Sequence, residues 1–122
     1  MDTSYAGTLR EVATDKGVLR YHEAGEGPEL LLLHGSGPGV TGWRNFNGNL
    51  EFFARHFRCL VLEFPGFGVS DDFGGHPMLD AQGATLVRES VAEACDTSGC
   101  TLIVVDHDVD QWLDVVDRVV VL

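Results

Sequence analysis

The sequence predicts an α/β fold: a three-layer, mostly parallel sheet with an antiparallel hairpin at its N-terminal end. Strand-like apolar runs alternate with segments of helical spacing along the 122 residues. That alternation implies right-handed βαβ crossovers with helices on both faces of the sheet. The run Leu30–Leu33 is apolar throughout, as expected for a strand covered on both faces. The length fits one domain over residues 1–122, because single domains usually contain about 100–150 residues.

The first half of the chain contains the predicted hairpin, a buried strand and a helix. Gly7–Ala13 and Val18–Glu23 are short and β-rich, and the connection Asp15–Gly17 provides a glycine for a tight turn. The glycine-rich stretch His34–Gly39 follows the strand Leu30–Leu33. A helix is then indicated by apolar residues at helical spacing, which are Trp43, Phe46, Leu50, Phe53 and Ala54.

The second half continues the alternation. Arg58–Phe64 is a second strand of the buried type, closed by the loop Pro65–Asp71. After a glycine-rich connection over residues 74–77, Leu79–Ala94 has an amphipathic helical pattern, and Gly99 is placed to end that helix. The remaining predicted elements are a strand at Thr101–Val105, a short helix at Val109–Val116 and a strand at Val119–Leu122.

Charge and hydropathy exclude several classes of function. Lysines and arginines number 8 against 19 aspartates and glutamates, which gives a net charge of −11 and repels nucleic acid and anionic lipid. The longest apolar runs, Leu30–Leu33 and Val119–Leu122, are far shorter than the roughly 18–20 residues of a membrane-spanning helix. Met1–Arg10 lacks the basic and apolar regions of a secretory signal. We therefore expect a cytoplasmic protein without nucleic-acid or membrane partners.

The three cysteines, Cys59, Cys95 and Cys100, are odd in number and form no C-x-x-C pair. The interpretation we favour is a buried strand residue at position 59 and two unpaired thiols in a reducing compartment. The alternative is a disulfide bond between Cys95 and Cys100 across the turn Asp96–Gly99.

Residues 7–72 carry a set of glycine-rich motifs. Leu31–Gly39 reads LLLHGSGPG and Glu63–Asp71 reads EFPGFGVSD, and between them lie Trp43, Asn45-Phe46, Asn49-Leu50 and Ala54–Phe57. Together these residues resemble the N-terminal part of an α/β-hydrolase of the type that cleaves carbon–carbon bonds in meta-cleavage products. The resemblance implies that backbone N–H groups near Gly35 and Ser36 belong to an oxyanion hole. The structural alternative, which we favour, is a tight strand-to-helix turn.

Residues 78–122 carry a different set. Met78–Ala81, Thr101–Asp108 and Asp117–Leu122 resemble the D-loop, the switch-histidine strand with its H-loop, and the following strand of an ABC-transporter ATPase domain. The three elements occur in that family's order. The resemblance implies that His107 corresponds to the histidine that contacts the γ-phosphate.

Both resemblances lack the motifs that perform chemistry. The sequence contains no G-x-S-x-G nucleophile turn and no G-x-x-x-x-G-K-[ST] phosphate loop, and Lys16 is its only lysine. We therefore interpret the chain as an engineered or selected chimera, with hydrolase-like residues 1–73, a connection at 74–77 and an ATPase-like segment at 78–122. On this interpretation we expect no native catalytic function, no catalytic residue and no cofactor.

Two alternative functions stay open. One is weak ester hydrolysis, which would use the residual oxyanion turn at Gly35 and Ser36 together with His107 or His34 as nucleophile or base. Ser36 is less suited as a nucleophile, because the sequence places no base beside it. The other is residual nucleotide binding, against which the missing phosphate loop argues.

The acidic group around His107 is a candidate cation site. Oxygen and imidazole donors at close spacing come from Asp106, His107, Asp108 and Asp110. We favour a solvated acidic start of the helix Val109–Val116, because negative side chains are stabilised at helix N-termini.

The order of the elements allows the two parts to share one sheet. In the hydrolase-like arrangement, Thr101–Val105 lies beside Leu30–Leu33, and Asp106–Asp108 takes the place of the nucleophile turn. The ATPase-like alternative places Thr101–Val105 and Val119–Leu122 on either side of Leu30–Leu33.

We also expect a homodimer. Both parts lack sheet partners of the families they resemble, and Val119–Leu122 is a short apolar strand that predicts a poorly protected sheet edge. Pairing with a second copy, through strand addition or through a helix face such as Trp43–Phe53, would cover this apolar surface.

Overall fold

The computed structural model describes residues 1–15, 17–35, 39–65, 67–70, 81–106 and 112–120. The elements in chain order are α1 (Tyr5–Thr8), β1 (Leu9–Thr14), β2 (Gly17–Ala24), β3 (Glu29–Leu33), α2 (Gly42–Ala54), β4 (Arg58–Leu62), α3 (Ala81–Ser98) and β5 (Thr101–Val104). The predicted connection at 74–77 lies outside the described residues.

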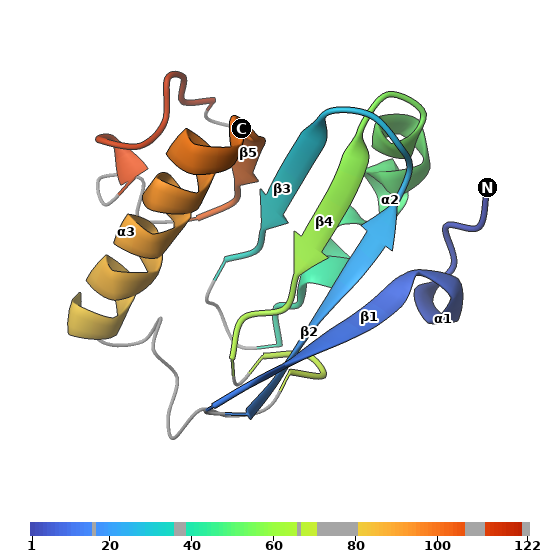
Figure 1. Ribbon diagram of the computed structural model, residues 1–122, viewed down its shortest axis with the longest axis horizontal. Coiled ribbons are helices and arrows are strands. Elements are labelled where there is room, and N and C mark those ends of the chain that lie inside the picture. Colours follow the sequence, from blue (N-terminus) through green and yellow to red (C-terminus); the bar gives the residue numbers. More distant parts are fainter. Residues whose placement is uncertain (16, 36–38, 66, 71–80, 107–111, 121–122) are drawn as a thin grey trace.

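In the described part of the chain, five strands form one sheet in the order β1-β2-β4-β3-β5 (Figure 1). β1 and β2 form the predicted antiparallel hairpin, in which Thr14 lies opposite Gly17. β2 also pairs antiparallel with β4, whereas β3 pairs parallel with both β4 and β5. The sheet is therefore mixed rather than mostly parallel, because the hairpin joins it through an antiparallel contact with β4.

The position of β5 decides between the two predicted topologies. Leu30 lies opposite Thr101 and Leu33 lies opposite Val104, which is the hydrolase-like arrangement. The other side of β3 is occupied by β4, so the ATPase-like alternative is wrong. The predicted strand Val119–Leu122 is also wrong where the structure describes it: Val119 and Val120 are exposed and outside any strand.

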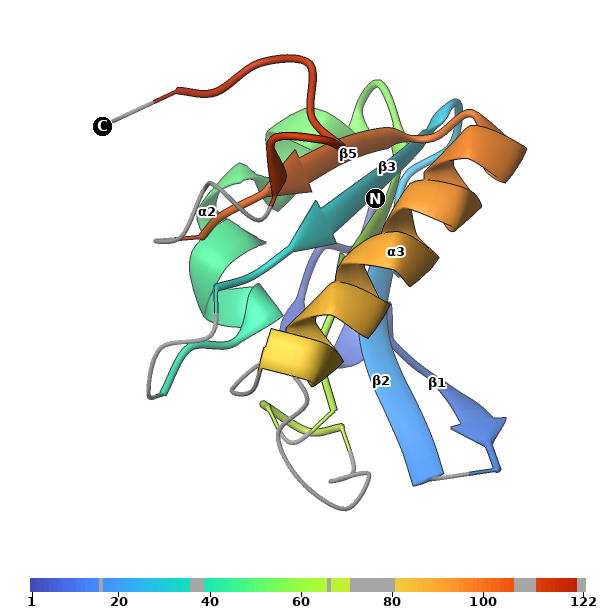
Figure 2. The same cartoon turned by 90° about the vertical axis from the view of Figure 1, so that its left-hand side faces the viewer.

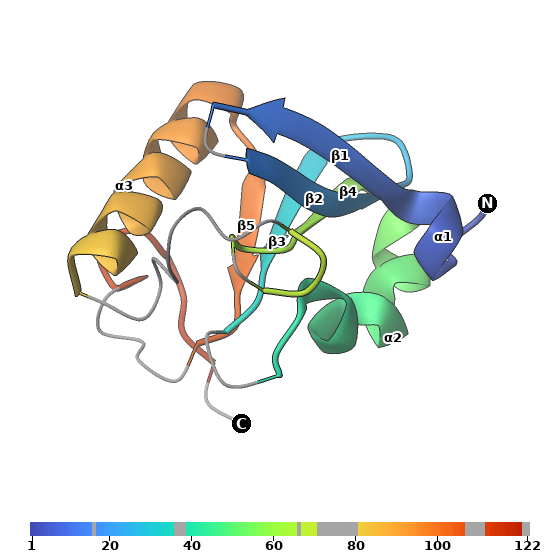
Figure 3. The same ribbon diagram turned by 90° about the horizontal axis from the view of Figure 1, so that it is seen from below.

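Helices cover both faces of the sheet, as predicted. Figures 2 and 3 show α2 on one side and α3 on the other. Successive side chains of a strand point to opposite faces. Leu30 and Leu32 accordingly belong to the cluster under α2, whereas Leu31 and Leu33 pack on the side of α3.

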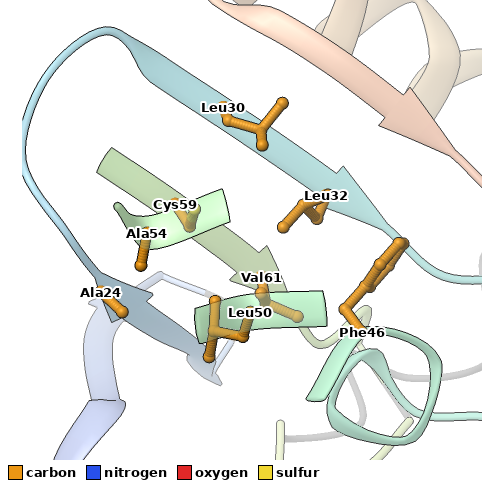
Figure 4. Packing of buried hydrophobic residues seen from close by; sticks show 8 residues of the cluster. All are labelled: Ala24, Leu30, Leu32, Phe46, Leu50, Ala54, Cys59 and Val61. Carbon is orange, nitrogen blue, oxygen red and sulfur yellow. The ribbon is translucent and has the colours of Figure 1, made fainter. Parts of the chain in front are cut away.

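The α2 face contains a continuous apolar core (Figure 4). Its buried members are Ala24, Leu30, Leu32, Phe46, Leu50, Ala54, Cys59 and Val61. Three of them, Phe46, Leu50 and Ala54, follow the i, i+4, i+8 spacing of the predicted helical stripe. The helix begins after Thr41, whose Oγ1 accepts a hydrogen bond from the Arg44 N–H at 3.0 Å. The prediction that Cys59 is a buried strand residue is confirmed.

The N-terminal boundary differs from prediction. Gly7 and Thr8 belong to α1 instead of the first strand, because Ser4 caps this short helix by accepting the Gly7 N–H at 3.1 Å. Thr8 is held there by its own hydroxyl, which donates to the Ser4 carbonyl at 2.8 Å.

The C-terminal helices also differ from prediction. α3 continues past Ala94 to Ser98 and ends at Gly99, which has a φ of +72°. The described part of the predicted helix Val109–Val116 forms turns, in which the Trp112 carbonyl accepts from the Val115 and Val116 N–H groups at 2.9 and 3.0 Å. None of the helices in the described ranges is long and apolar enough to cross a bilayer.

Candidate functional site

The candidate site lies where β3 and β5 end. The chain leaves β3 through α2 and enters β4, which lies on one side of β3. It then passes through α3 and enters β5, which lies on the other side of β3. The sheet therefore has a topological switch point between β3 and β5, and α/β sheets bind ligands outside the carboxyl ends of strands at such a point.

Gly35 and Val105 bring the two strand ends into contact. The Val105 N–H donates to the Leu33 carbonyl at 3.0 Å, which extends the β3–β5 pairing one residue past the end of β5. A Cβ added to Gly35 would lie 3.2 Å from the Val105 carbonyl oxygen. This close approach favours glycine at position 35, since a side chain there fits only if the Val105 backbone shifts by a few tenths of an ångström.

Two side chains hold the Gly35 peptide groups. The Gly35 carbonyl accepts a hydrogen bond from His34 Nδ1 at 2.5 Å, and the Gly35 N–H donates to Asn45 Oδ1 at 3.4 Å. His34 Nε2 in turn accepts from the Phe64 N–H at 3.0 Å. The turn after β3 is thereby tied to both α2 and the end of β4.

His34 is not placed to act as a base. It is 1% exposed, and both ring nitrogens are used: Nε2 accepts a backbone proton, so the imidazole proton lies on Nδ1. Burial lowers the pKa of His34, against the smaller opposite effect of the bond to Gly35. This placement does not favour His34 as nucleophile or base, and its contacts position Gly35 instead.

Glu63 is a buried acid that follows β4. Its Oε2 accepts from the Gly42 N–H at 2.7 Å and its Oε1 accepts from the Trp43 N–H at 3.0 Å. These donors belong to the first turn of α2, where N–H groups lack helical partners and the dipole favours an anion. Burial raises the pKa of Glu63, and the two backbone hydrogen bonds oppose that rise.

His22 lies next to Glu63 with one ring nitrogen unpaired. The Thr8 hydroxyl gives its proton to Ser4, so it accepts from His22 Nδ1 at 2.8 Å. His22 Nε2 then carries no proton and has no hydrogen-bond partner among the described residues. It lies 4.0 Å from Glu63 Oε1, the same distance that separates His34 Nε2 from Oε2. Burial lowers the pKa of His22, so a neutral imidazole faces the acid.

The loop after β4 closes around Glu63. Ser70 Oγ accepts from the Arg20 N–H at 2.7 Å and donates to the Glu63 carbonyl at 2.8 Å. A Cβ added to Gly68, whose φ is +54°, would lie 2.6 Å from Glu63 Oε2. Ser70 and Gly68 of this loop thus hold Glu63 in place, and Glu63 in turn binds the first N–H groups of α2.

The predicted site residues are only partly described. Gly35 lies in the candidate site, whereas Ser36, His107, Asp108 and Asp110 lie outside the described residues. Asp106 is described, and its Oδ2 accepts from Trp112 Nε1 at 3.0 Å. The ranges that the structure describes contain no group of three or more histidine, cysteine or acidic residues suited to a metal ion. The favoured solvated acidic segment and the alternative cation site at Asp106, His107, Asp108 and Asp110 both stay untested.

Sequence reasoning missed Glu63, His22 and Asn45. One signal for Glu63 was available, because a charge that directly follows the buried run Cys59–Leu62 requires a partner. His22 gave no such signal. Its burial depends on Tyr5 and Trp43, whose ring centroids each lie 4.8 Å from the imidazole.

Solved structures define the class of fold. The chain is similar to the 2-hydroxy-6-oxo-6-phenylhexa-2,4-dienoate hydrolase of Rhodococcus sp. strain RHA1, with a TM-score of 0.62 and 19% identity over 88% of this chain and 42% of that chain. A hydrolase from Pseudomonas aeruginosa PA01 gives a TM-score of 0.58 and 26% identity over 82% of this chain and 37% of that chain. The described sheet is thus a truncated α/β-hydrolase-like fold. No family model matches the chain.

Relatives by sequence define the type of hydrolase that the N-terminal portion resembles. The 2-hydroxy-6-oxononadienedioate/2-hydroxy-6-oxononatrienedioate hydrolase of Burkholderia vietnamiensis is 49% identical over 55 residues, which are 43% of this chain and 19% of the relative. The enzyme of the same name from Cupriavidus pinatubonensis is 44% identical over 72 residues, or 54% of this chain and 25% of the relative. The chain therefore spans a quarter or less of these relatives. They show an α/β-hydrolase N-terminal portion of the meta-cleavage-product type.

These comparisons correct two expectations. The relatives are named hydrolases, which overturns the expectation of no native catalytic function. They also give no support to a P-loop-ATPase-derived segment or to a chimera. The structural likeness to the Rhodococcus enzyme covers 88% of the chain, more than residues 1–77 alone can supply. The segment after residue 78 therefore contributes to a hydrolase-like sheet.

Proposed function

We propose that the chain is a hydrolase whose substrate carbonyl binds over the carboxyl ends of β3 and β5. The observation that carries the proposal is the contact of Gly35 with Val105, where an added Cβ would lie 3.2 Å from the Val105 oxygen. The relatives' names supply the substrate class, 2-hydroxy-6-oxo-dienedioates. Such acids carry a carbonyl at C6, and addition of a nucleophile to it produces an oxyanion.

The turn that begins at Gly35 is suited to stabilise that oxyanion. A preorganised N–H group lowers the barrier because it needs no reorganisation when negative charge develops. His34 and Asn45 supply this preorganisation. His34 binds the Gly35 carbonyl, and Asn45 binds the Gly35 N–H. The present bond of the Gly35 N–H to Asn45 is 3.4 Å long, beyond the usual 2.7–3.2 Å range. A developing oxyanion therefore competes well for this donor.

We assign the role of base to His107. Val105 directly follows β5 and lies beside Gly35, and Asp106 and His107 come next in the sequence. Histidine is the side chain that most often transfers protons in enzymes. His22 and His34 are buried, and His56 precedes β4 at the opposite end of the strands. His107 is the histidine that follows β5 in the sequence.

The histidine assignment is tested by hydrolysis of p-nitrophenyl acetate and of 2-hydroxy-6-oxononadienedioate. We expect kcat/KM to fall by about 100-fold in His107→Ala, the usual contribution of a general base. His56→Ala is the matched control, because His56 is exposed and precedes β4 at the opposite end of the strands. Equal rates in the wild type and both variants, or rates no higher than free imidazole gives, would contradict the proposal.

The oxyanion turn is tested separately. Gly35→Ala places a methyl group against the Val105 oxygen, and we expect kcat to fall while the protein stays folded by circular dichroism. Gly48→Ala is the matched control, since an added Cβ there meets nothing within 4 Å and alanine favours the helix. Unchanged kcat in Gly35→Ala would exclude this turn from catalysis.

A further inference from the structure

Cys95 and Cys100 form a close pair of thiols outside the candidate active site. Their sulfur atoms lie 2.9 Å apart, with Cys100 Sγ donating to Cys95 Sγ. Both are free thiols and half-buried, whereas the third cysteine, Cys59, is fully buried. A disulfide bond is about 2.05 Å long, so a small side-chain movement brings the two sulfurs to bonding distance.

The turn after α3 produces this pairing. Gly99 adopts a φ of +72°, and its N–H donates to the Cys95 carbonyl at 2.8 Å, which is the left-handed termination common at helix ends. The Cys100 N–H also donates to Ser98 Oγ at 3.2 Å. The chain therefore reverses at Gly99 and returns Cys100 over the last turn of the helix.

The thiol pair is reachable by small molecules. Cys95 and Cys100 both line a cavity of about 730 Å³, which is bounded by the end of α3, by β5 and by residues 114–120. Within the described ranges, no third histidine, cysteine or acidic residue completes a metal site with them. Two neighbouring thiols are the arrangement that thiol–disulfide exchange uses.

We propose that Cys95 and Cys100 form a reversible disulfide by exchange with a small-molecule disulfide such as oxidised glutathione. The Cys100 thiolate attacks one glutathione sulfur, the glutathione S–S bond breaks, and one glutathione leaves as a thiol. Cys95 then attacks the Cys100 sulfur, the protein S–S bond forms, and the second glutathione leaves. Two electrons pass from the cysteine sulfurs to glutathione, and the two cysteine protons end on the two glutathione thiols.

The environment of Cys95 supports this order of attack. Burial and the neighbouring Cys100 thiol raise the pKa of Cys95 to about 12, so Cys95 is a protonated thiol at neutral pH and is a poor first nucleophile. Cys95 Sγ lies 2.9 Å from Cys100 Sγ, so a mixed disulfide formed at Cys100 is within reach of Cys95, which closes the bond.

The test is equilibration of the full chain with graded ratios of oxidised to reduced glutathione. The protein is then denatured, treated with N-ethylmaleimide and weighed by mass spectrometry. We expect the oxidised chain to be about 2 Da lighter and to bind one maleimide, at Cys59, in place of three. The change should reverse with dithiothreitol. Stable glutathione adducts, disulfide-linked dimers, or three maleimides at every ratio would overturn the proposal.

Single variants test the order of attack. We expect Cys95→Ser to accumulate glutathione on Cys100, and we expect Cys100→Ser to form the adduct at least ten-fold more slowly. Cys59→Ser is the control and should still become about 2 Da lighter on oxidation, with no maleimide bound. Equal adduct rates in Cys95→Ser and Cys100→Ser would contradict the assigned order. None of these outcomes depends on hydrolase activity, so this proposal and the proposed function can fail independently.

Discussion

The two faces of the sheet differ in how they are built. On the α2 face, eight buried residues form one cluster, and Leu32 and Cys59 are 0% exposed. On the α3 face of the described structure, the cluster has five buried members, and Thr101–Val104 of β5 are half-buried or exposed. Apolar burial stabilises in proportion to the area removed from water, so among the described residues the α2 side is the more completely buried of the two.

The polar groups follow the same division. Glu63 and His34 are buried near the start of α2 and bind backbone groups, and the buried His22 binds the Thr8 hydroxyl. The thiols Cys95 and Cys100 lie half-buried beside a cavity on the other side. The two sides therefore differ in their polar groups. The α2 side holds the turn at Gly35 in place, and the α3 side carries the two thiols for which we propose reversible oxidation.

Truncation of one leucine on each side gives the largest expected contrast. Leu32→Ala empties a fully buried site in β3, and we expect it to lower the free energy of unfolding by about 3–4 kcal/mol. Leu102→Ala in β5 removes a half-buried side chain, and we expect a loss of about 1 kcal/mol. Urea denaturation measures both. Equal losses of unfolding free energy would contradict the inferred difference in packing between the two sides.

Removal of the Glu63 charge tests the buried polar framework. Glu63→Gln puts an amide NH₂ opposite one of the two backbone N–H donors of α2, Gly42 or Trp43. We expect a loss of about 1–3 kcal/mol, the cost of a buried donor without a partner.

Glu51→Gln is the matched control for Glu63→Gln. Glu51 also lies in α2, but its 3.5 Å contact with Arg55 is exposed, and such pairs contribute about 0.5 kcal/mol or less. A Glu63→Gln loss as small as that of Glu51→Gln, measured by urea denaturation, would refute the structural role of the buried acid.

The buried histidines predict a smaller, pH-dependent effect. The folded-state pKa values of His22 and His34 are lowered by burial, so the unfolded chain binds protons first as the pH falls. Stability is then highest above the ordinary histidine pKa of about 6.5 and is lost as the pH falls toward the folded values. Glu63 acts in the opposite direction, because its raised pKa gives stability that is lost as the pH rises through the folded value.

The histidine effect can be isolated with one variant. We expect the loss of stability between about pH 7.5 and 5.5 to be smaller in His22→Gln than in the wild type, because glutamine can bond Thr8 without titrating. The measurement is the urea midpoint at each pH. Parallel profiles for the two proteins would exclude His22 as a source of the acid sensitivity.

The smallest expected effect concerns the α3 side. Trp112→Phe keeps a large buried ring but removes the 3.0 Å bond from Trp112 Nε1 to Asp106. We expect a loss of about 1 kcal/mol, the usual net value of one hydrogen bond. Thermal unfolding of the wild type and the variant measures this loss. A loss of unfolding free energy as large as that of Leu32→Ala would contradict the expectation that the α3 side contributes less to stability.

The predicted homodimer stays a prediction, but its expected surface changes. Because Val119 and Val120 form no strand, the outermost strand on that side of the described sheet is β5. Light scattering over a dilution series tests the association.

The sequence by itself determined the local elements. The apolar run of β3, the stripe Phe46, Leu50 and Ala54 of α2, and the glycine that ends α3 were all predictable, because each depends on residues a few positions apart. The glycine-rich motifs also indicated an α/β-hydrolase, although the missing nucleophile turn and the later segment led to the chimera interpretation, which the comparisons do not support.

Only the tertiary structure decided which distant residues meet. Glu63 lies twenty or more positions from the N–H groups that it binds, and His22 is buried through contacts with Tyr5 and Trp43. The placement of β5 beside β3 likewise required pairing across the whole of α2, β4 and α3. Such contacts depend on chain closure over long separations and on the packing of faces, and no local pattern of residues encodes them.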